Sequence, residues 1–80
     1  MADKKNIREL IHTAAAHLAA ARVDSPRLSA ELILARVLDV RREYLLSHPE
    51  RVLTPEEERE AETLLTRRAL GEPVAYILGR

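Results

Sequence analysis

The sequence predicts an all-α protein, a small bundle of four to five short helices that together form one domain over residues 1–80. Three observations support this. Apolar residues recur at helical spacing in successive segments, Ser-Pro and Thr-Pro pairs stand where helices would begin, and no segment alternates like a half-exposed strand. The polar connections, about three to seven residues long, are typical of neighbouring helices in a compact bundle.

The first predicted helix begins at Ile7 and is amphipathic. Its second half is rich in alanine, which favours helix and lets a neighbouring helix approach closely. Its apolar residues form one stripe along about four turns, as expected for a helix that packs on a core: Ile7, Leu10, Ile11, Ala14, Leu18 and Ala21.

The second predicted helix begins at Pro26. Ser25 is a good N-cap residue, and proline suits the first helical position because its missing N–H would have no partner there. The apolar residues that follow form a wide band, so we expect this helix to be central and the most buried. The band comprises Leu28, Leu32, Ile33, Leu34, Ala35, Val37 and Leu38.

A short third helix is predicted over residues 43–47, because His48-Pro49 would end it. The fourth helix begins at Pro55, where Thr54 and Glu57 have the spacing of a capping box. Glutamates gather in its first turns and arginines in its last, an order that suits the helix dipole. Its apolar side is narrow and places it on the outside of the bundle: Ala61, Leu64, Leu65 and Ala69.

After the fourth helix the chain turns and begins a new apolar segment. Gly71 suits the left-handed position that closes a helix, and Pro73 cannot continue that helix but can open the next. Residues 73–78 are predicted to form a short fifth helix or helical turn that ends at Gly79. We therefore expect the chain to be the front part of a longer protein, with residues 71–80 as a connector toward a domain that follows.

Composition narrows the possible functions. Thirteen basic residues balance thirteen acidic ones, and each half of the chain is also close to neutral. The charge distribution therefore argues against nucleic-acid binding. Two Tyr without Phe or Trp leave almost no aromatic surface on which bases could stack. The absence of Cys and of a membrane-length apolar run predicts a soluble cytoplasmic protein with no membrane association.

The conventional catalytic residues do not form a recognisable site. His12 and His17 are five residues apart and so point in different directions around a helix, and His48 precedes a proline. Gly71 and Gly79 are the only glycines, so no phosphate-binding loop is present. We therefore expect no catalytic residue, no metal ligands and no cofactor-binding residue within residues 1–80.

The candidate contact residues lie near the junction that follows the fourth helix. Arg67, Arg68 and Arg80 bring guanidinium groups to one end of the domain, where they serve either the helix dipole and solubility or a contact with a partner. Glu72 lies in the turn between them. Tyr76 is predicted to be a core or interdomain packing residue, and its hydroxyl would need a hydrogen-bond partner.

The junction also resembles a known family. Residues 67–79, Arg-Arg-Ala-Leu-Gly-Glu-Pro-Val-Ala-Tyr-Ile-Leu-Gly, are similar to the segment that ends the N-terminal domain of the HemK/PrmC family, the protein-glutamine N5-methyltransferases of peptide chain release factors. The most specific part is residues 71–77. Residues 25–35 and 53–56 add weaker matches, and the resemblance covers the chain from about Ile7 to Arg80.

The resemblance implies that a β-hairpin and a Rossmann-like methyltransferase domain follow in the parent protein. There S-adenosylmethionine would bind a Gly-rich loop, and an Asn-Pro-Pro-Tyr motif would hold the substrate glutamine. Neither motif occurs in this chain, so no catalytic or cofactor residue can be assigned, and residues 1–80 alone are predicted to be inactive. The implied role of the helical domain is to help bind and orient the release factor, whose Gly-Gly-Gln loop enters the distant active site.

Two alternatives remain open. The chain could be a stand-alone helical module that binds proteins or nucleic acid without enzymatic activity, since short helices around turns can mimic a helix-turn-helix. The domain could instead mainly stabilise or orient its own C-terminal catalytic domain, with Val74, Tyr76 and Ile77 as the docking surface.

Overall fold

The computed structural model describes residues 4–79 and confirms the predicted all-α class. Within these residues β-structure is limited to an isolated bridge between Asn6 and Val52. Five helices follow one another along the chain: α1 (Ile7–Ala20), α2 (Pro26–Leu38), α3 (Arg42–Ser47), α4 (Pro55–Ala69) and α5 (Val74–Ile77).

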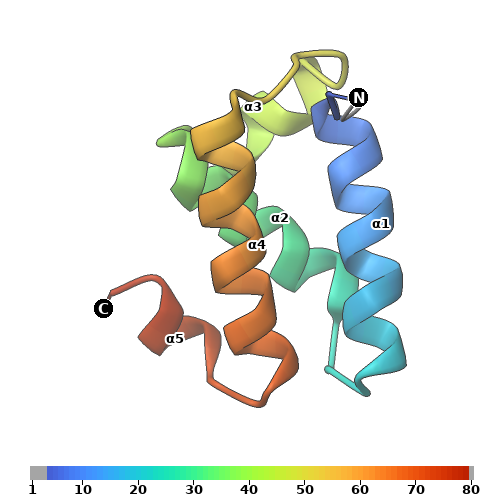
Figure 1. The fold of residues 1–80 in the computed structure, drawn as a ribbon, viewed down its shortest axis with the longest axis vertical. Coiled ribbons are helices and arrows are strands. Elements are labelled where there is room, and N and C mark those ends of the chain that lie inside the picture. Colours follow the sequence, from blue (N-terminus) through green and yellow to red (C-terminus); the bar gives the residue numbers. More distant parts are fainter. Residues whose placement is uncertain (1–3, 80) are drawn as a thin grey trace.

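The helices pack around α2. In Figure 1, α1 and α4 run side by side in the same direction, and α2 lies behind them. The short helix α3 lies at the end of the bundle where α1 and α4 begin, and α5 lies near the end where α4 finishes. Because α2 contacts all four other helices, it is the central helix that the wide apolar band predicts.

Two capping boxes fix the beginnings of α1 and α4. At α4 the predicted box is present: Glu57 N–H donates to Thr54 Oγ1 (3.1 Å), and Thr54 N–H donates to Glu57 Oε1 (2.9 Å). At α1 the same arrangement joins Asn6 and Glu9, at 2.8 and 3.1 Å, a box that the sequence analysis missed. Each box satisfies two backbone N–H groups, because a helix leaves its first donors without partners.

The predicted N-cap role of Ser25 is only partly correct. Pro26 does occupy the first helical position of α2, but Ser25 has a left-handed backbone (φ 49°) and its side chain makes no capping hydrogen bond. Its carbonyl oxygen instead accepts the N–H of Ser29 at 3.0 Å. N-cap residues whose side chains bond the helix end usually have an extended backbone, as Asn6 and Thr54 do, and Ser25 does not.

The ends of α1 and α2 use left-handed residues other than glycine. Arg22 (φ 64°) follows α1, and Asp39 (φ 57°) follows α2. In each case the next N–H reaches back to close the helix, with Val23 donating to the Leu18 carbonyl at 3.0 Å and Val40 to the Ala35 carbonyl at 3.0 Å. Glycine is the usual residue at such positions, and so the sequence alone does not mark these two ends.

The core is aliphatic and draws on all five helices. Leu28, predicted to lie in the apolar band of α2, is 41% exposed, because the buried side of that helix runs through Ser29 and Glu31 as well as the aliphatic residues. The buried apolar residues are Ile7, Leu10, Ile11, Ala14, Leu18, Ala30, Ile33, Leu34, Ala35, Leu38, Leu45, Leu53, Ala61, Leu65 and Ile77.

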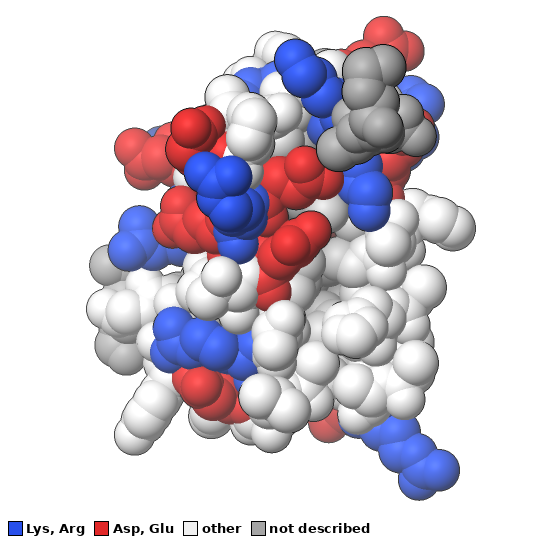
Figure 2. All heavy atoms as spheres, in the orientation of Figure 1, with Lys and Arg blue, Asp and Glu red and all other residues white. Residues whose placement is uncertain are grey.

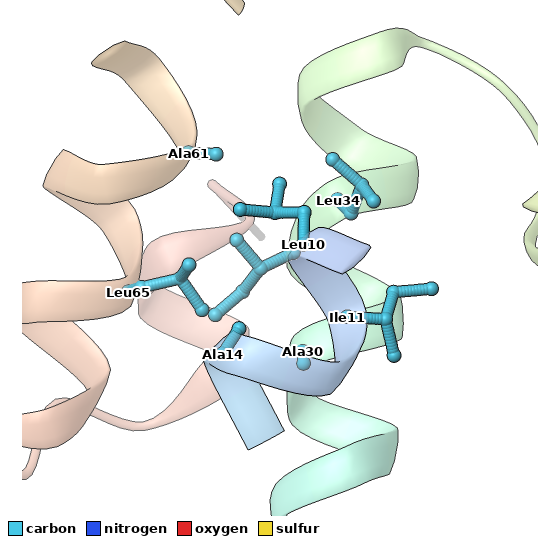
Figure 3. A pocket seen from close by; sticks show the side chains of 8 residues that line it. Leu10, Ile11, Ala14, Ala30, Leu34, Ala61 and Leu65 are labelled. Carbon is cyan, nitrogen blue, oxygen red and sulfur yellow. The ribbon is translucent and has the colours of Figure 1, made fainter. Parts of the chain in front are cut away.

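Figure 3 shows the centre of this core between α1, α2 and α4. Leu10 from α1 and Leu65 from α4 point toward each other there. The remaining space does not admit a water molecule. This part of the domain is therefore packed interior and not a ligand pocket.

One carboxylate lies inside the fold. Glu31 on α2 is 3% exposed, and it accepts from Arg42 Nε at 2.7 Å and pairs with Arg27 Nε at 3.0 Å. Arg42 belongs to α3, so this contact joins two helices. Both guanidinium side chains remain at least half exposed. A buried charge is tolerated when it is paired in this way.

Candidate functional site

The structure brings three of the predicted contact residues together at the turn after α4. Arg67 Nη2 and Nε donate to Glu72 Oε1 at 2.7 and 2.9 Å, and Arg68 Nη1 donates to the backbone carbonyl of Glu72 at 3.0 Å. We call this group of Arg67, Arg68 and Glu72 the junction clasp. It joins the last turn of α4 to the residues that lead into α5.

The turn within the clasp closes α4 as the sequence predicts. Gly71 has φ 108°, and its N–H donates to the Arg68 carbonyl at 3.0 Å. Glu72 N–H reaches the Arg67 carbonyl at 3.1 Å. These two bonds form a Schellman motif, which satisfies carbonyls that α4 would otherwise leave without partners. A Cβ at position 71 would meet no atom within 4 Å, so the positive φ alone explains the need for glycine.

The clasp gives both arginines an intramolecular role. Arg67 directs two donors at one carboxylate oxygen, and Arg68 is held by a carbonyl while its Nε is buried without a protein partner. Both side chains are half-buried and so are partly withdrawn from solvent. A contact between these arginines and a partner protein stays a prediction.

The ion pair shifts the pKa values of Glu72 and Arg67 in opposite directions. The hydrogen bond from Arg67 lowers the pKa of Glu72 below its ordinary value of 4.5, with the charge of Arg67 adding to the effect. The same hydrogen bond raises the pKa of Arg67. Each shift favours the charged form, so the pair is intact at neutral pH.

Replacing Glu72 with glutamine should therefore destabilise the domain in a pH-dependent manner. Because the pKa of Glu72 is lower in the folded than in the unfolded protein, its ionised carboxylate stabilises the fold at pH values above the pKa of the unfolded state. That contribution to the free energy of unfolding is lost as the pH falls through the pKa of the folded state. Urea unfolding should show a lower midpoint for Glu72→Gln than for the parent at pH 7, and the two midpoints should converge below pH 4.5. Glu60→Gln, at an exposed position of α4, is the control. If the urea midpoint of Glu72→Gln stayed below that of the parent by the same amount at acid pH, this role of the ion pair would be contradicted.

Tyr76 does not lie in the core, one of the two places predicted for it, and its packing between domains stays a prediction. Its side chain is 72% exposed, because α5 directs Ile77, which is only 5% exposed, into the core. Ile77 is therefore unavailable to the docking surface predicted with Val74 and Tyr76. Leu70, which the sequence analysis did not single out, is 81% exposed at the end of α4. Arg80 lies outside the described residues.

A shallow groove of about 240 Å³ runs between α1 and α4. Beside the groove, residues 10–21, which belong to α1 and its C-cap, include no Asp, Glu, Lys or Arg. Figure 2 shows uncharged side chains over this part of α1, whereas charged side chains gather over the first turns of α4. The groove is lined by Lys5, Leu10, Thr13, Ala14, His17, Glu62, Leu65 and Thr66.

The histidines do not form a site. His12 and His17 are exposed on α1, and the ring of His48 stacks on Tyr44 at a centroid distance of 3.9 Å. Among residues 4–79 no three His, Cys, Asp or Glu side chains are grouped so that they could hold a metal ion. The helices of this part of the chain are also too short or too polar to cross a membrane.

Comparison with known proteins identifies the domain. The family model described as the PrmC N-terminal domain matches residues 9–79. A release factor glutamine methyltransferase of Koribacter versatilis is 44% identical over 73 residues, which cover 91% of this chain and 26% of the relative. Proteins of the same name from Aliivibrio fischeri and Nitratidesulfovibrio vulgaris are 48% identical over 56 residues and 42% identical over 73 residues.

The matched segment covers 70% of this chain for the Aliivibrio protein and 91% for the Nitratidesulfovibrio protein. The same segment spans only 20% and 25% of those relatives, so the chain corresponds to about a quarter of their length. Because the family model covers nearly all of residues 4–79, and the described residues form the helical domain that the resemblance implies, this chain belongs to the PrmC N-terminal domain family.

Proposed function

We propose that this chain is the N-terminal domain of a release factor glutamine methyltransferase, and that it helps the enzyme bind and orient the release factor. The observation that carries the proposal is the match of residues 9–79 to the PrmC N-terminal domain. The names of the relatives add the substrate, since they are called release factor glutamine methyltransferases at 42% to 48% identity.

The proposal assigns the domain a binding role in preference to a chemical one. Between α1, α2 and α4 the core has no room for water, and the histidines lie apart on the surface. A glutamine on a Gly-Gly-Gln loop offers little surface, so recognition of the folded substrate needs contacts away from the reacting amide. Such remote contacts can position the amide for reaction and thereby contribute to its rate.

The cofactor belongs to the remainder of the parent protein in this proposal. S-adenosylmethionine would supply the methyl group there, because the Gly-rich loop and the Asn-Pro-Pro-Tyr motif that the family uses are absent from residues 1–80. The proposal also places the parent in the cytoplasm, the compartment that a chain without Cys predicts.

A chimera tests the proposed role. The Koribacter relative would be prepared whole, without its N-terminal domain, and with that domain replaced by residues 1–80 of this chain. Methylation would be measured on an intact release factor and on a short Gly-Gly-Gln peptide. We expect the deletion to slow methylation of the intact factor by about tenfold or more, the equivalent of about 1.4 kcal/mol of lost binding, and to spare the peptide. The chimera should restore the rate.

Two results would count against this role. Unchanged methylation of the intact factor after deletion would show that the domain does not contribute to recognition. If the deletion slowed methylation of the release factor and of the peptide equally, the domain would support the catalytic domain instead. Calorimetry on residues 1–80 provides a separate check, because tight binding of S-adenosylmethionine to this chain alone would contradict its assignment as a recognition domain.

A further inference from the structure

We propose that the exposed and half-buried apolar residues after α4 form a docking surface for the catalytic domain of the same polypeptide. We call Leu70, Val74, Ala75, Tyr76 and Leu78 the junction surface. The inference rests on the proposed function for the existence of that catalytic domain, and it goes further by assigning the residues that would contact it.

Exposure is the first observation. Leu70 is 81% exposed and Tyr76 is 72% exposed, and these are the highest values among the large apolar side chains of residues 4–79. The other exposed ones are dispersed: Leu28 on α2, Leu46 on α3 and Val52 in the connection to α4. Single exposed apolar residues are normal on a protein surface. Here the two large apolar side chains with the highest exposed fractions lie within one short segment, which indicates a contact with a partner.

Charge is the second observation. Charged residues make up 32% of the whole chain, but Glu72 is the only one between residues 69 and 79. Its carboxylate is already held by Arg67, at 2.7 and 2.9 Å. Within residues 69–79 the junction surface therefore has no charged neighbour other than the paired Glu72. Burial of such a surface incurs little cost from desolvated polar groups.

Anchoring is the third observation. Ile77 from α5 is buried in the core, and α5 contacts both α2 and α4. The junction clasp ties the start of this segment to the last turn of α4. The junction surface is thus held in place before any partner arrives, which reduces the entropy lost on docking.

The relatives identify the occupant. The chain corresponds to about a quarter of their length and matches their N-terminal domain, so in a parent of that size most of the polypeptide follows this segment. The junction surface occupies the last ten described residues, next to that continuation. A covalently attached domain is present at a high effective concentration, so even a small apolar contact can be populated. A release factor has no such advantage at this surface.

Hydrogen exchange in the chimera with the Koribacter relative tests the docking, without release factor present. We expect the amides of residues 70–79 to exchange about tenfold more slowly in the chimera than in residues 1–80 alone, because docking suppresses local opening. L70S/Y76S should remove that protection, whereas L46S, at a 63% exposed position on α3, should keep it. In the isolated domain, both variants should have the same urea midpoint of unfolding as the unsubstituted chain.

Each alternative outcome overturns the docking. Equal exchange in the chimera and in the isolated domain would show that the surface is not covered by the catalytic domain. Protection that appears only after release factor is added would assign the surface to the substrate. Unfolding of the isolated domain by L70S/Y76S would show that these side chains serve its own core. Because the exchange measurement requires no methylation, its failure is distinct from failure of the proposed recognition role.

Discussion

Replacing Ile33 with alanine is expected to lower the free energy of unfolding by about 2–5 kcal/mol, the range measured when large aliphatic side chains are removed from cores. Ile33 is fully buried on α2, the helix that contacts all the others, and the core beside it has no room for water. The cavity left by the substitution would be lined by aliphatic side chains, which offer a water molecule no hydrogen-bond partners. A domain of this size has only about 4–12 kcal/mol of stability, so a substantial part of it would be lost.

Urea unfolding followed by circular dichroism measures this loss. Ile33→Val, which removes a single methylene, should cost only about 0.5–1.5 kcal/mol. Leu46→Ala serves as the surface control, since Leu46 is 63% exposed on α3, and its cost should stay within about 0.5 kcal/mol. If Ile33→Ala were no more damaging than Leu46→Ala, the assignment of α2 as the central helix would be wrong.

The second large effect is expected at the buried carboxylate. Removing both guanidinium partners in the double variant R27A/R42A should destabilise the domain by about 3–5 kcal/mol, because it leaves Glu31 charged, buried and unpaired. Glu31→Gln should cost less, about 1–2 kcal/mol. The amide keeps the shape of the side chain, and the two guanidinium groups, already at least half exposed, can return to water.

The order of these two variants is the informative measurement. Both are compared with the parent in urea at pH 7, with Arg36→Ala as the control at an exposed position in the last turn of the same helix. Arg36→Ala should change the free energy of unfolding by no more than about 0.5 kcal/mol. A larger cost for Glu31→Gln than for R27A/R42A would contradict the expected penalty for a buried carboxylate without a partner, because both variants remove the two ion pairs.

The buried role of Glu31 could not be predicted from the sequence. It follows Ala30 on α2 and precedes Leu32, a pattern in which a glutamate usually faces solvent. Its burial depends on Arg42, eleven residues away on another helix. Only the packing of α3 against α2 brings the two together. The left-handed Arg22 and Asp39 show the same limit, because tight connections impose a backbone that their residue types do not signal.

The candidate site was predicted in part. Arg67, Arg68 and Glu72 lie close in sequence near a helix end, so the sequence alone groups them, and the turn at Gly71 brings them into contact. The sequence predicts that Tyr76 packs either in the core or between domains, and the burial of Ile77 on the other side of α5 excludes only the core. Leu70 was missed because helical spacing alone does not distinguish an exposed leucine from a buried one.

The sequence by itself determined the helical class, the cap of α4 and the glycine closure after it, because each depends on residues within a few positions of one another. It also determined the family resemblance, whose most specific part is the short run of residues 71–77. The tertiary structure alone decided which apolar residues are left outside the core. Ile77 is buried while Leu70 and Tyr76 stay exposed, since burial depends on how α5 contacts α2 and α4, segments distant in the chain. That choice changes the predicted junction from a set of candidate contact residues into an anchored apolar surface.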